Sequence, residues 1–132
     1  MKRKIILILL IVVIITSGIV FENKTSFISR YFISKQIKAL ENQVQQIKHL
    51  ETTDISECRV VPLGHTPCEA PRDYIVYSIK NTNESKLLEL VNEIGELDKK
   101  RNNLDRFELP CMMPLPVKVE PELVSGMCVI KK

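Results

Sequence analysis

Cysteine is the residue type in this chain whose number and spacing most directly predict chemistry. The 132-residue sequence has four cysteines, at positions 58, 68, 111 and 128. An even number in a small extracellular domain is typical of disulfide bonds. Three pairings are possible. We expect Cys58 to pair with Cys68 and Cys111 with Cys128, because the members of each pair are close in sequence and flanked by turn-forming residues.

A zinc site is the alternative use of these cysteines, with His65 as an additional ligand. The cysteine spacings match no Cys-x-x-Cys pattern, which most structural zinc sites contain. An oxidising compartment also disfavours the free thiolates that zinc requires. We therefore predict disulfides, with no metal and no cofactor.

No arrangement of residues in the sequence is typical of an enzyme. A nucleophile elbow, a glycine-rich phosphate loop and paired histidines are all missing from the sequence. The carboxylates of Glu89, Glu93 and Glu96 are those expected on a solvent-exposed helix face, and they single out no acid and base pair. We predict a protein that is not an enzyme.

Two proline-rich loops are candidate recognition sites. The first runs from Pro62 to Pro71 and contains His65, which could contact a partner or titrate near neutral pH, although a solvated loop histidine is the simpler interpretation. The second presents three apolar side chains on a proline-restricted backbone. An ordered loop loses little entropy on binding, but these side chains could instead cover the edge of a small core. They are Met112, Met113 and Leu115.

These loops follow an N-terminal segment that is typical of an exported protein. Met1-Lys2-Arg3-Lys4 precedes an almost unbroken apolar run, residues 5–21. A cationic start before such a run indicates a signal peptide or a membrane anchor, with the later chain outside the cytoplasm. Thr16-Ser17-Gly18 resembles a cleavage site, but the apolar run continues past it. The sequence leaves both a membrane-anchored and a secreted protein open.

The net charge of +3 does not indicate nucleic-acid binding. The chain has 19 basic and 16 acidic residues, and Lys2, Arg3 and Lys4 account for the difference. The remainder is formally neutral and poor in aromatic residues. It therefore lacks the basic surface that phosphate-backbone binding requires.

An amphipathic helix or stalk is predicted between the apolar run and the cysteine-containing part, over residues 22–54. Its apolar positions alternate in steps of four and three, which places them on one face. This face could pack on the chain's own domain or pair with a second copy. The face consists of Ile33, Ile37, Leu40, Val44 and Ile47. Just upstream, a cluster of Phe27, Ile28, Tyr31 and Phe32 would suit a membrane interface if the anchor is retained.

Residues 55–132 are predicted to form the disulfide-stabilised domain. We expect a strand over 58–61 that ends at Pro62, and a central strand over 73–79 that is buried on both faces. A helix begins after Asn83 and ends near 102–103, and a turn and closing strand lie within 123–130. The fold class is α+β, with a small antiparallel sheet and one packed helix, preceded by the membrane or signal helix and the amphipathic helix.

The cysteine-containing part resembles a family of small exported bacterial proteins whose function is not known. The resemblance is carried by Cys68-Glu69-Ala70-Pro71, by Tyr74-Ile75-Val76-Tyr77-Ser78 and by the two later cysteines. The family pattern has Cys-Gly-Gly-Pro before a Tyr-x-Val-Tyr-Ser strand, then Ser-Asp-Cys and a final Gly-x-Cys. This chain differs from the family at Glu69-Ala70 and at Leu109-Pro110. The resemblance implies export and disulfide use, and no activity.

Together these features predict a non-enzymatic binding or structural module of the bacterial cell envelope. The alternative is a secreted inhibitor of an extracellular hydrolase that acts through the proline-rich loops. The expected partners are the membrane, through the N-terminal helix, and a protein or a second copy of the chain.

Overall fold

A computed structural model of the chain describes residues 27–104, 111 and 118–131. The chain divides into two units, Met1–Phe32 and Ile33–Lys132, and each is described by itself. The expected membrane or signal segment, residues 1–21, lies outside the described residues, as do Met112, Met113 and Leu115. Among the described residues, no helix has both the length and the apolar character needed to cross a bilayer.

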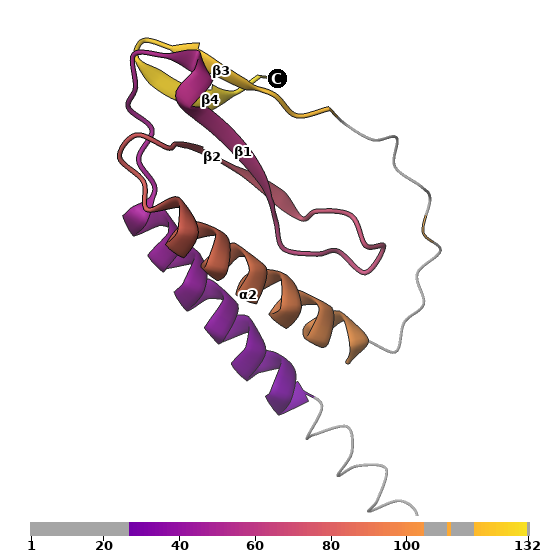
Figure 1. Ribbon diagram of the computed structural model, residues 1–132. Helices are drawn as coiled ribbons and strands as arrows, with labels where there is room; N and C mark the ends of the chain where they lie inside the picture. The colour runs from indigo at the N-terminus through magenta and orange to yellow at the C-terminus, as the bar shows by residue number, and fades with distance from the viewer. Residues whose placement is uncertain (1–26, 105–110, 112–117, 132) are drawn as a thin grey trace, which may run out of the picture. The chain divides into compact units, whose positions relative to one another are not determined.

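Two long helices form one layer of the second unit. The first is helical over residues 27–47, of which 33–47 belong to this unit, and the second is α2, Glu84–Asn103. They lie side by side and run in opposite directions (Figure 1). The apolar face of the first helix enters the core: Ile33, Ile37 and Val44 are buried, and Leu40 and Ile47 pack partly against it. Self-association through this face stays a prediction, and it would require the helix to leave this core.

The ends of α2 agree with the sequence prediction. The side chain of Asn83 accepts a hydrogen bond from the backbone N–H of Lys86 and so caps the first turn, where Glu84 complements the helix dipole. Lys100 and Arg101 lie in the last turn, at the negative end of the dipole. Because Leu87, Leu90 and Ile94 recur in steps of three and four, one face of the helix is buried.

An antiparallel hairpin covers α2. Strand β1, Cys58–Leu63, pairs with β2, Asp73–Ser78, and Val61 lies opposite Ile75. The face of the hairpin toward the helices carries the buried side chains of Leu63, Ile75 and Tyr77.

Two expectations for this hairpin are wrong. The first strand continues through Pro62, which is tolerated because β1 pairs only with β2 within the described chain and so forms an edge. Strand β2 is not a central strand buried on both faces, because its sheet has two strands and Tyr74 and Val76 on its other face are only half-buried. The apolar run therefore reflects one buried face, with Ile75 and Tyr77, and one half-buried face.

A second hairpin completes the described fold. Strand β3, Pro121–Val124, pairs with β4, Met127–Ile130, through a turn in which Ser125 and Gly126 both have positive φ. This is the backbone that tight two-residue hairpin turns require. The α+β class is confirmed, but the single sheet that we expected is two two-stranded sheets.

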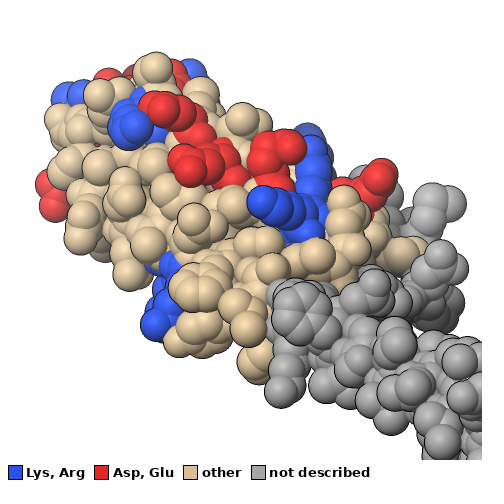
Figure 2. All heavy atoms as spheres, turned by 90° about the horizontal axis from the view of Figure 1, so that it is seen from below, with Lys and Arg blue, Asp and Glu red and all other residues tan. Residues whose placement is uncertain are grey.

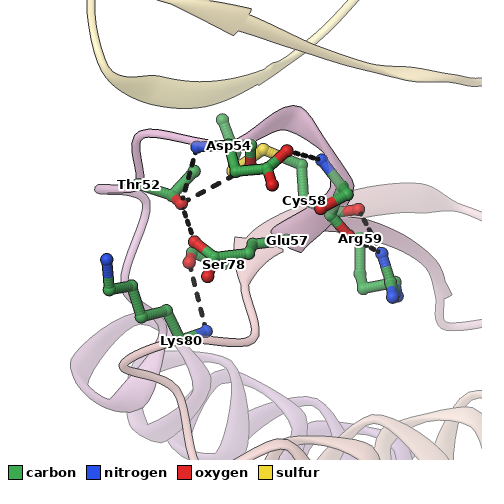
Figure 3. The surroundings of a disulfide bond; sticks show 9 residues. Thr52, Asp54, Glu57, Cys58, Arg59, Ser78 and Lys80 are labelled. Atoms are coloured by element: carbon green, nitrogen blue, oxygen red, sulfur yellow. Dashed lines mark hydrogen bonds between the residues drawn. A yellow bond between two sulfur atoms is a disulfide. The ribbon is translucent and has the colours of Figure 1, made fainter.

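A crossing segment, residues 48–52, ties the two hairpins together. The backbone oxygen of His49 accepts from Ser78 in β2, and that of Leu50 accepts from Cys128 in β4. Beyond this segment lies a single 3-10 turn, η1, Ile55–Glu57, which is capped by the side chain of Asp54. The Thr52 hydroxyl donates a hydrogen bond to the Glu57 carboxylate (Figure 3). These bonds hold the start of β1 against β4.

The disulfides are formed, but both expected pairings are wrong. Cys58 is bonded to Cys128 and Cys68 to Cys111, with a Cα–Cα distance of 5.6 Å in each pair. Strand β1 carries the chain away from Cys58 by about 3.3 Å per residue. Its five steps end at Leu63, and the chain returns to the level of Leu63 only at Asp73. Cys68, midway between them, therefore lies far beyond the roughly 7 Å that a disulfide can bridge. Proximity in sequence was misleading because the intervening chain is extended.

Candidate functional site

The candidate site is built around the loop of residues 64–72, which joins β1 to β2 and lies against α2. The loop begins at Gly64, whose φ of +66° is readily adopted only by glycine. A Cβ atom at this position would lie 2.1 Å from Oδ2 of Asp98. Glycine is therefore needed here both for the backbone turn and for the space that the Asp98 carboxylate occupies.

Asp98 on α2 fixes the loop and is completely buried. Its Oδ2 accepts a hydrogen bond from the backbone N–H of His65 and another from Nε of Arg72, both at 3.1 Å. Its Oδ1 lies 2.7 Å from Nη2 of Arg101, an ion pair that lacks hydrogen-bond geometry. A buried carboxylate is costly without such partners, so the loop and the helix are mutually dependent.

Arg72 extends this network to the first helix. Its Nη2 lies 2.5 Å from Oε1 of Glu41, so one guanidinium joins the loop to both helices. Partial burial disfavours the charged form of Arg72, but the hydrogen bonds that it donates to Glu41 and Asp98, together with their negative charges, outweigh this effect and raise its pKa. The network contains two carboxylates and two guanidinium groups, so its net charge is zero. These groups belong to Glu41, Asp98, Arg72 and Arg101.

His65 is held on α2 by its backbone. Its N–H donates to Asp98, as above, and its carbonyl oxygen accepts from Nδ2 of Asn102 at 3.0 Å. The imidazole ring lies over Gly95, where an added Cβ would come within 3.3 Å of the ring carbon Cδ2. The close neighbour of this helical glycine is therefore the loop histidine.

The tip of the loop is a tight turn. The backbone N–H and the hydroxyl of Thr66 both donate to the carbonyl oxygen of Ala70, and the N–H of Glu69 donates to that of Thr66. Glu69 has a φ of +59°, a left-handed conformation that is unusual for a residue with a side chain. Cys68 is bonded to Cys111 beyond the end of α2. The tip is therefore held by a covalent bond as well as by hydrogen bonds.

The loop and α2 form the walls of a shallow groove. One depression of about 330 Å³ is lined by apolar side chains from the strand, the loop and the helix, including Val61, Pro71, Leu88 and Val91. A second, of about 350 Å³, adjoins the loop tip and the end of α2, with Thr66, Asn102 and Asn103 in its lining. The side chains shared by both depressions are those of His65, Glu69 and Lys99. The groove thus has an apolar end and a polar end.

Lys99, one of the charged residues at the polar end, is paired with a carboxylate on the same helix. Nζ of Lys99 lies 2.7 Å from Oε1 of Glu96, and its hydrogen bond and charge lower the pKa of that carboxyl, with a smaller contribution from His65. On the face drawn in Figure 2, Lys and Arg side chains lie beside Asp and Glu side chains. The groove therefore offers hydrogen bonds and mixed charge.

The structure places the sequence-predicted residues in different regions. His65 lies at the centre of the groove, and Cys68 holds its loop. Cys58 and Cys128 lie between the two hairpins, away from the groove, in a disulfide that is almost completely buried. The expected second loop, with Met112, Met113 and Leu115, lies outside the described residues.

Sequence reasoning missed Asp98, Gly64, Arg72 and Asn102, which hold the loop. One signal was available for Asp98. The buried positions Leu87, Leu90 and Ile94 continue in a step of four to residue 98, so a carboxylate falls on the apolar face of α2. A charged residue at such a position needs partners from elsewhere in the fold.

The fold and the groove define a small disulfide-stabilised α+β domain. The chain matches no family model, no curated protein and no solved structure with which it was compared.

Proposed function

We propose that this protein is a non-enzymatic binding module of the bacterial cell envelope, and that the groove between α2 and the loop of residues 64–72 binds an extended segment of a protein partner. The observation that carries the proposal is the fixed loop. Asp98 and Asn102 hold the backbone of His65 against α2, and the Cys68–Cys111 disulfide holds the tip. A wall that is already ordered loses little entropy when a partner binds.

The lining of the groove favours a polypeptide over a small molecule. Its two depressions adjoin one another, and polar side chains at the loop tip and the end of α2 lie next to the apolar patch that contains Leu88 and Val91. Protein interfaces commonly combine an apolar centre with a polar, hydrated rim. We infer a partner segment that places an apolar side chain near Leu88 and a hydrogen-bonding side chain near Glu69.

An extracytoplasmic location is supported by the disulfides, because such bonds persist in oxidising compartments. The cationic start and the apolar run of the sequence point to delivery through, or retention in, a membrane. Alkaline phosphatase fused after Lys132 tests this part of the proposal, since that enzyme is active only outside the cytoplasm. The control is a fluorescent protein that folds only in the cytoplasm, fused at the same position. An inactive phosphatase fusion together with a fluorescent control fusion would contradict the proposed location.

The binding role is tested by photo-crosslinking in the envelope of the host. A photoreactive phenylalanine analogue replaces Leu88 in the groove or Val124 on β3, which are 42% and 46% exposed. We expect a discrete protein adduct from position 88 and none from position 124. In a competition experiment, untagged protein without the photoreactive residue is supplied in excess. The Leu88→Arg variant should leave the amount of adduct unchanged, whereas the Val124→Arg variant should reduce it by occupying the partner. Equal adducts from both positions would contradict the proposed site.

Inhibition of an extracellular hydrolase is the second candidate function. It is favoured by the tip of the loop, where Thr66, Ala70 and the disulfide fix a proline-flanked turn, a feature suited to occupying an enzyme cleft. Stoichiometric loss of protease or lysozyme activity on adding the purified protein would support this function. Reduction of the disulfide should then weaken the inhibition. Full hydrolase activity at excess protein would leave the binding module as the better proposal.

A further inference from the structure

The first two helical turns that the structure describes carry an unusual set of exposed apolar side chains. Phe27 is 71% exposed, Ile28 52%, Tyr31 51% and Phe32 61%. The rings of Tyr31 and Phe32 meet edge to face, with centroids 6.0 Å apart. We call these four residues the aromatic cluster. Contiguous apolar surface of this kind on a protein marks a contact with another molecule or a membrane.

Helical geometry places the cluster on one side of the helix. Phe27 and Tyr31 are four residues apart, as are Ile28 and Phe32, so each pair lies on adjacent turns of the same face. Tyrosine and phenylalanine are residues that amphipathic helices insert at the boundary between lipid headgroups and acyl chains. The cluster therefore has the composition and spacing of a membrane-surface helix.

The charges near the cluster in sequence have a single sign. From residue 23 to residue 40 the sequence contains Lys24, Arg30, Lys35 and Lys38 and no acidic residue. The remaining charges of the chain beyond the N-terminal start are mixed, and the part after residue 21 is neutral as a whole. A local basic excess beside exposed aromatic side chains favours a surface of anionic lipids, because basic groups near such a surface lower the free energy of binding.

We propose that the aromatic cluster is a lipid-contact surface that inserts into the headgroup region of an anionic bilayer. The apolar run of residues 5–21 lies only five residues upstream of Phe27 and would bring the cluster to the same bilayer. This inference rests on the membrane location proposed above and adds a second, peripheral contact to it. Insertion would keep the helix start at the membrane surface, at a depth of about 5–10 Å.

The chain contains no tryptophan, so a single introduced tryptophan reports its own surroundings. The test uses the full chain in vesicles, with Phe27→Trp or Phe32→Trp as probes and Val124→Trp as the exposed control on β3. We expect fluorescence at positions 27 and 32 to move to shorter wavelength and to be quenched by lipids brominated on the upper acyl chain. The control should show neither change. Quenching should be stronger in phosphatidylglycerol than in phosphatidylcholine vesicles, and added salt should narrow the difference.

Charge variants test the role of the basic excess. Arg30→Gln should lower the partitioning of the helix start into the anionic surface by about fivefold, which is the effect of one basic group near such a surface. Lys80→Gln, a change at an exposed position in the turn after β2, should leave the quenching unchanged. Equal effects of the two variants would show that the charge preference does not belong to the cluster, and would overturn the anionic-surface assignment.

Other outcomes separate the lipid contact from the anchor. If the chain remains with the vesicles while positions 27 and 32 stay unquenched, the lipid-contact surface is wrong and the anchor stands. If the chain does not associate with vesicles at all, both are wrong. A wavelength shift that depends on protein concentration and not on brominated lipid would assign the cluster to contact with a second copy and overturn the proposal. The groove is tested independently by photo-crosslinking.

Discussion

The carboxylate of Asp98 on α2 accepts a hydrogen bond from the backbone N–H of His65, 33 residues earlier in the chain, at 3.1 Å. This contact joins the loop between β1 and β2 to α2, the helix against which the loop lies. Arg72 and Arg101 supply the opposite charges that make burial of the carboxylate tolerable. The conformation of the candidate site thus depends on one buried side chain that would not itself contact a partner.

Removal of this carboxylate should strongly destabilise the domain. Asp98→Ala leaves the His65 N–H without its acceptor and removes one negative partner from each of Arg72 and Arg101, which stay partly exposed, so we expect a loss of about 2–3 kcal/mol in the free energy of unfolding. Urea unfolding followed by circular dichroism measures the change. Glu93→Ala, at an exposed position on the same helix, is the control and should change stability by less than about 0.5 kcal/mol. Similar effects of the two substitutions would contradict the role given to Asp98.

Gly64 and Gly126, the glycines with positive φ among the described residues, provide a matched test of the space around that carboxylate. Gly64→Ala introduces both backbone strain and a Cβ atom 2.1 Å from Asp98 Oδ2, so we expect a loss of about 3 kcal/mol or more. Gly126→Ala has the same backbone strain, but its nearest neighbour would be the Thr52 carbonyl oxygen at 3.7 Å. Its loss should be about 1–2 kcal/mol. Thermal or urea unfolding compares the two, and an equal loss would argue against the close contact at Gly64.

The two disulfides should open in a defined order. Cys111 is exposed and Cys68 is half-buried, whereas Cys58 and Cys128 are 3% and 0% exposed. Thiol attack requires access to sulfur, so mild reductant should open Cys68–Cys111 first. Alkylation during partial reduction, followed by peptide mapping, identifies the thiols released at each stage. Initial labelling of Cys58 or Cys128 would contradict this prediction, and the same map checks the pairing.

Loss of the buried disulfide between the two hairpins should also lower stability substantially. The bond joins residues 70 apart in sequence, and the chain-entropy model assigns about 4 kcal/mol to a loop of that length. Cys58→Ser combined with Cys128→Ser should lower the free energy of unfolding by this order. The same pair of changes at Cys68 and Cys111 serves as the comparison, since it removes the exposed bond. A loss below about 1 kcal/mol would mean that the reduced chain keeps its ends together by other contacts.

Stability should fall in alkaline solution because of Tyr77. Burial of its side chain, together with the hydrogen bond and negative charge of Glu84, raises its pKa from 10.0 to about 12. The unfolded state loses this proton near pH 10 while the folded state keeps it. The contribution is therefore complete below pH 10 and declines as the pH rises from 10 to about 12, by a total of roughly 3 kcal/mol.

Tyr77→Phe separates this titration from other alkaline effects. The variant lacks the phenol, so its unfolding free energy should change less between pH 10 and 12 than that of the parent protein. Urea unfolding at a series of pH values measures both slopes, and ultraviolet absorbance follows tyrosinate formation directly. Parallel slopes for the two proteins would contradict the assignment.

The local features of this fold could be predicted from the sequence because they depend on neighbouring residues. The period of the apolar residues predicted both helices, and Asn83 predicted the start of α2. The β-branched and aromatic run predicted β2, and Ser125-Gly126 lies in the expected turn region between β3 and β4. The even number of cysteines predicted two disulfides.

The tertiary structure alone decided which distant residues meet. The extended β1 carries Cys68 away from Cys58, and the crossing segment brings Cys128 to Cys58 instead. Whether β2 was central or at an edge depended on how many strands joined it, which its own residues do not encode. The position of His65 depends likewise on Asp98, a residue whose burial follows from its helix face but whose partners come from another part of the chain. Side-chain period is a local property, whereas pairing and burial of charge depend on the whole fold.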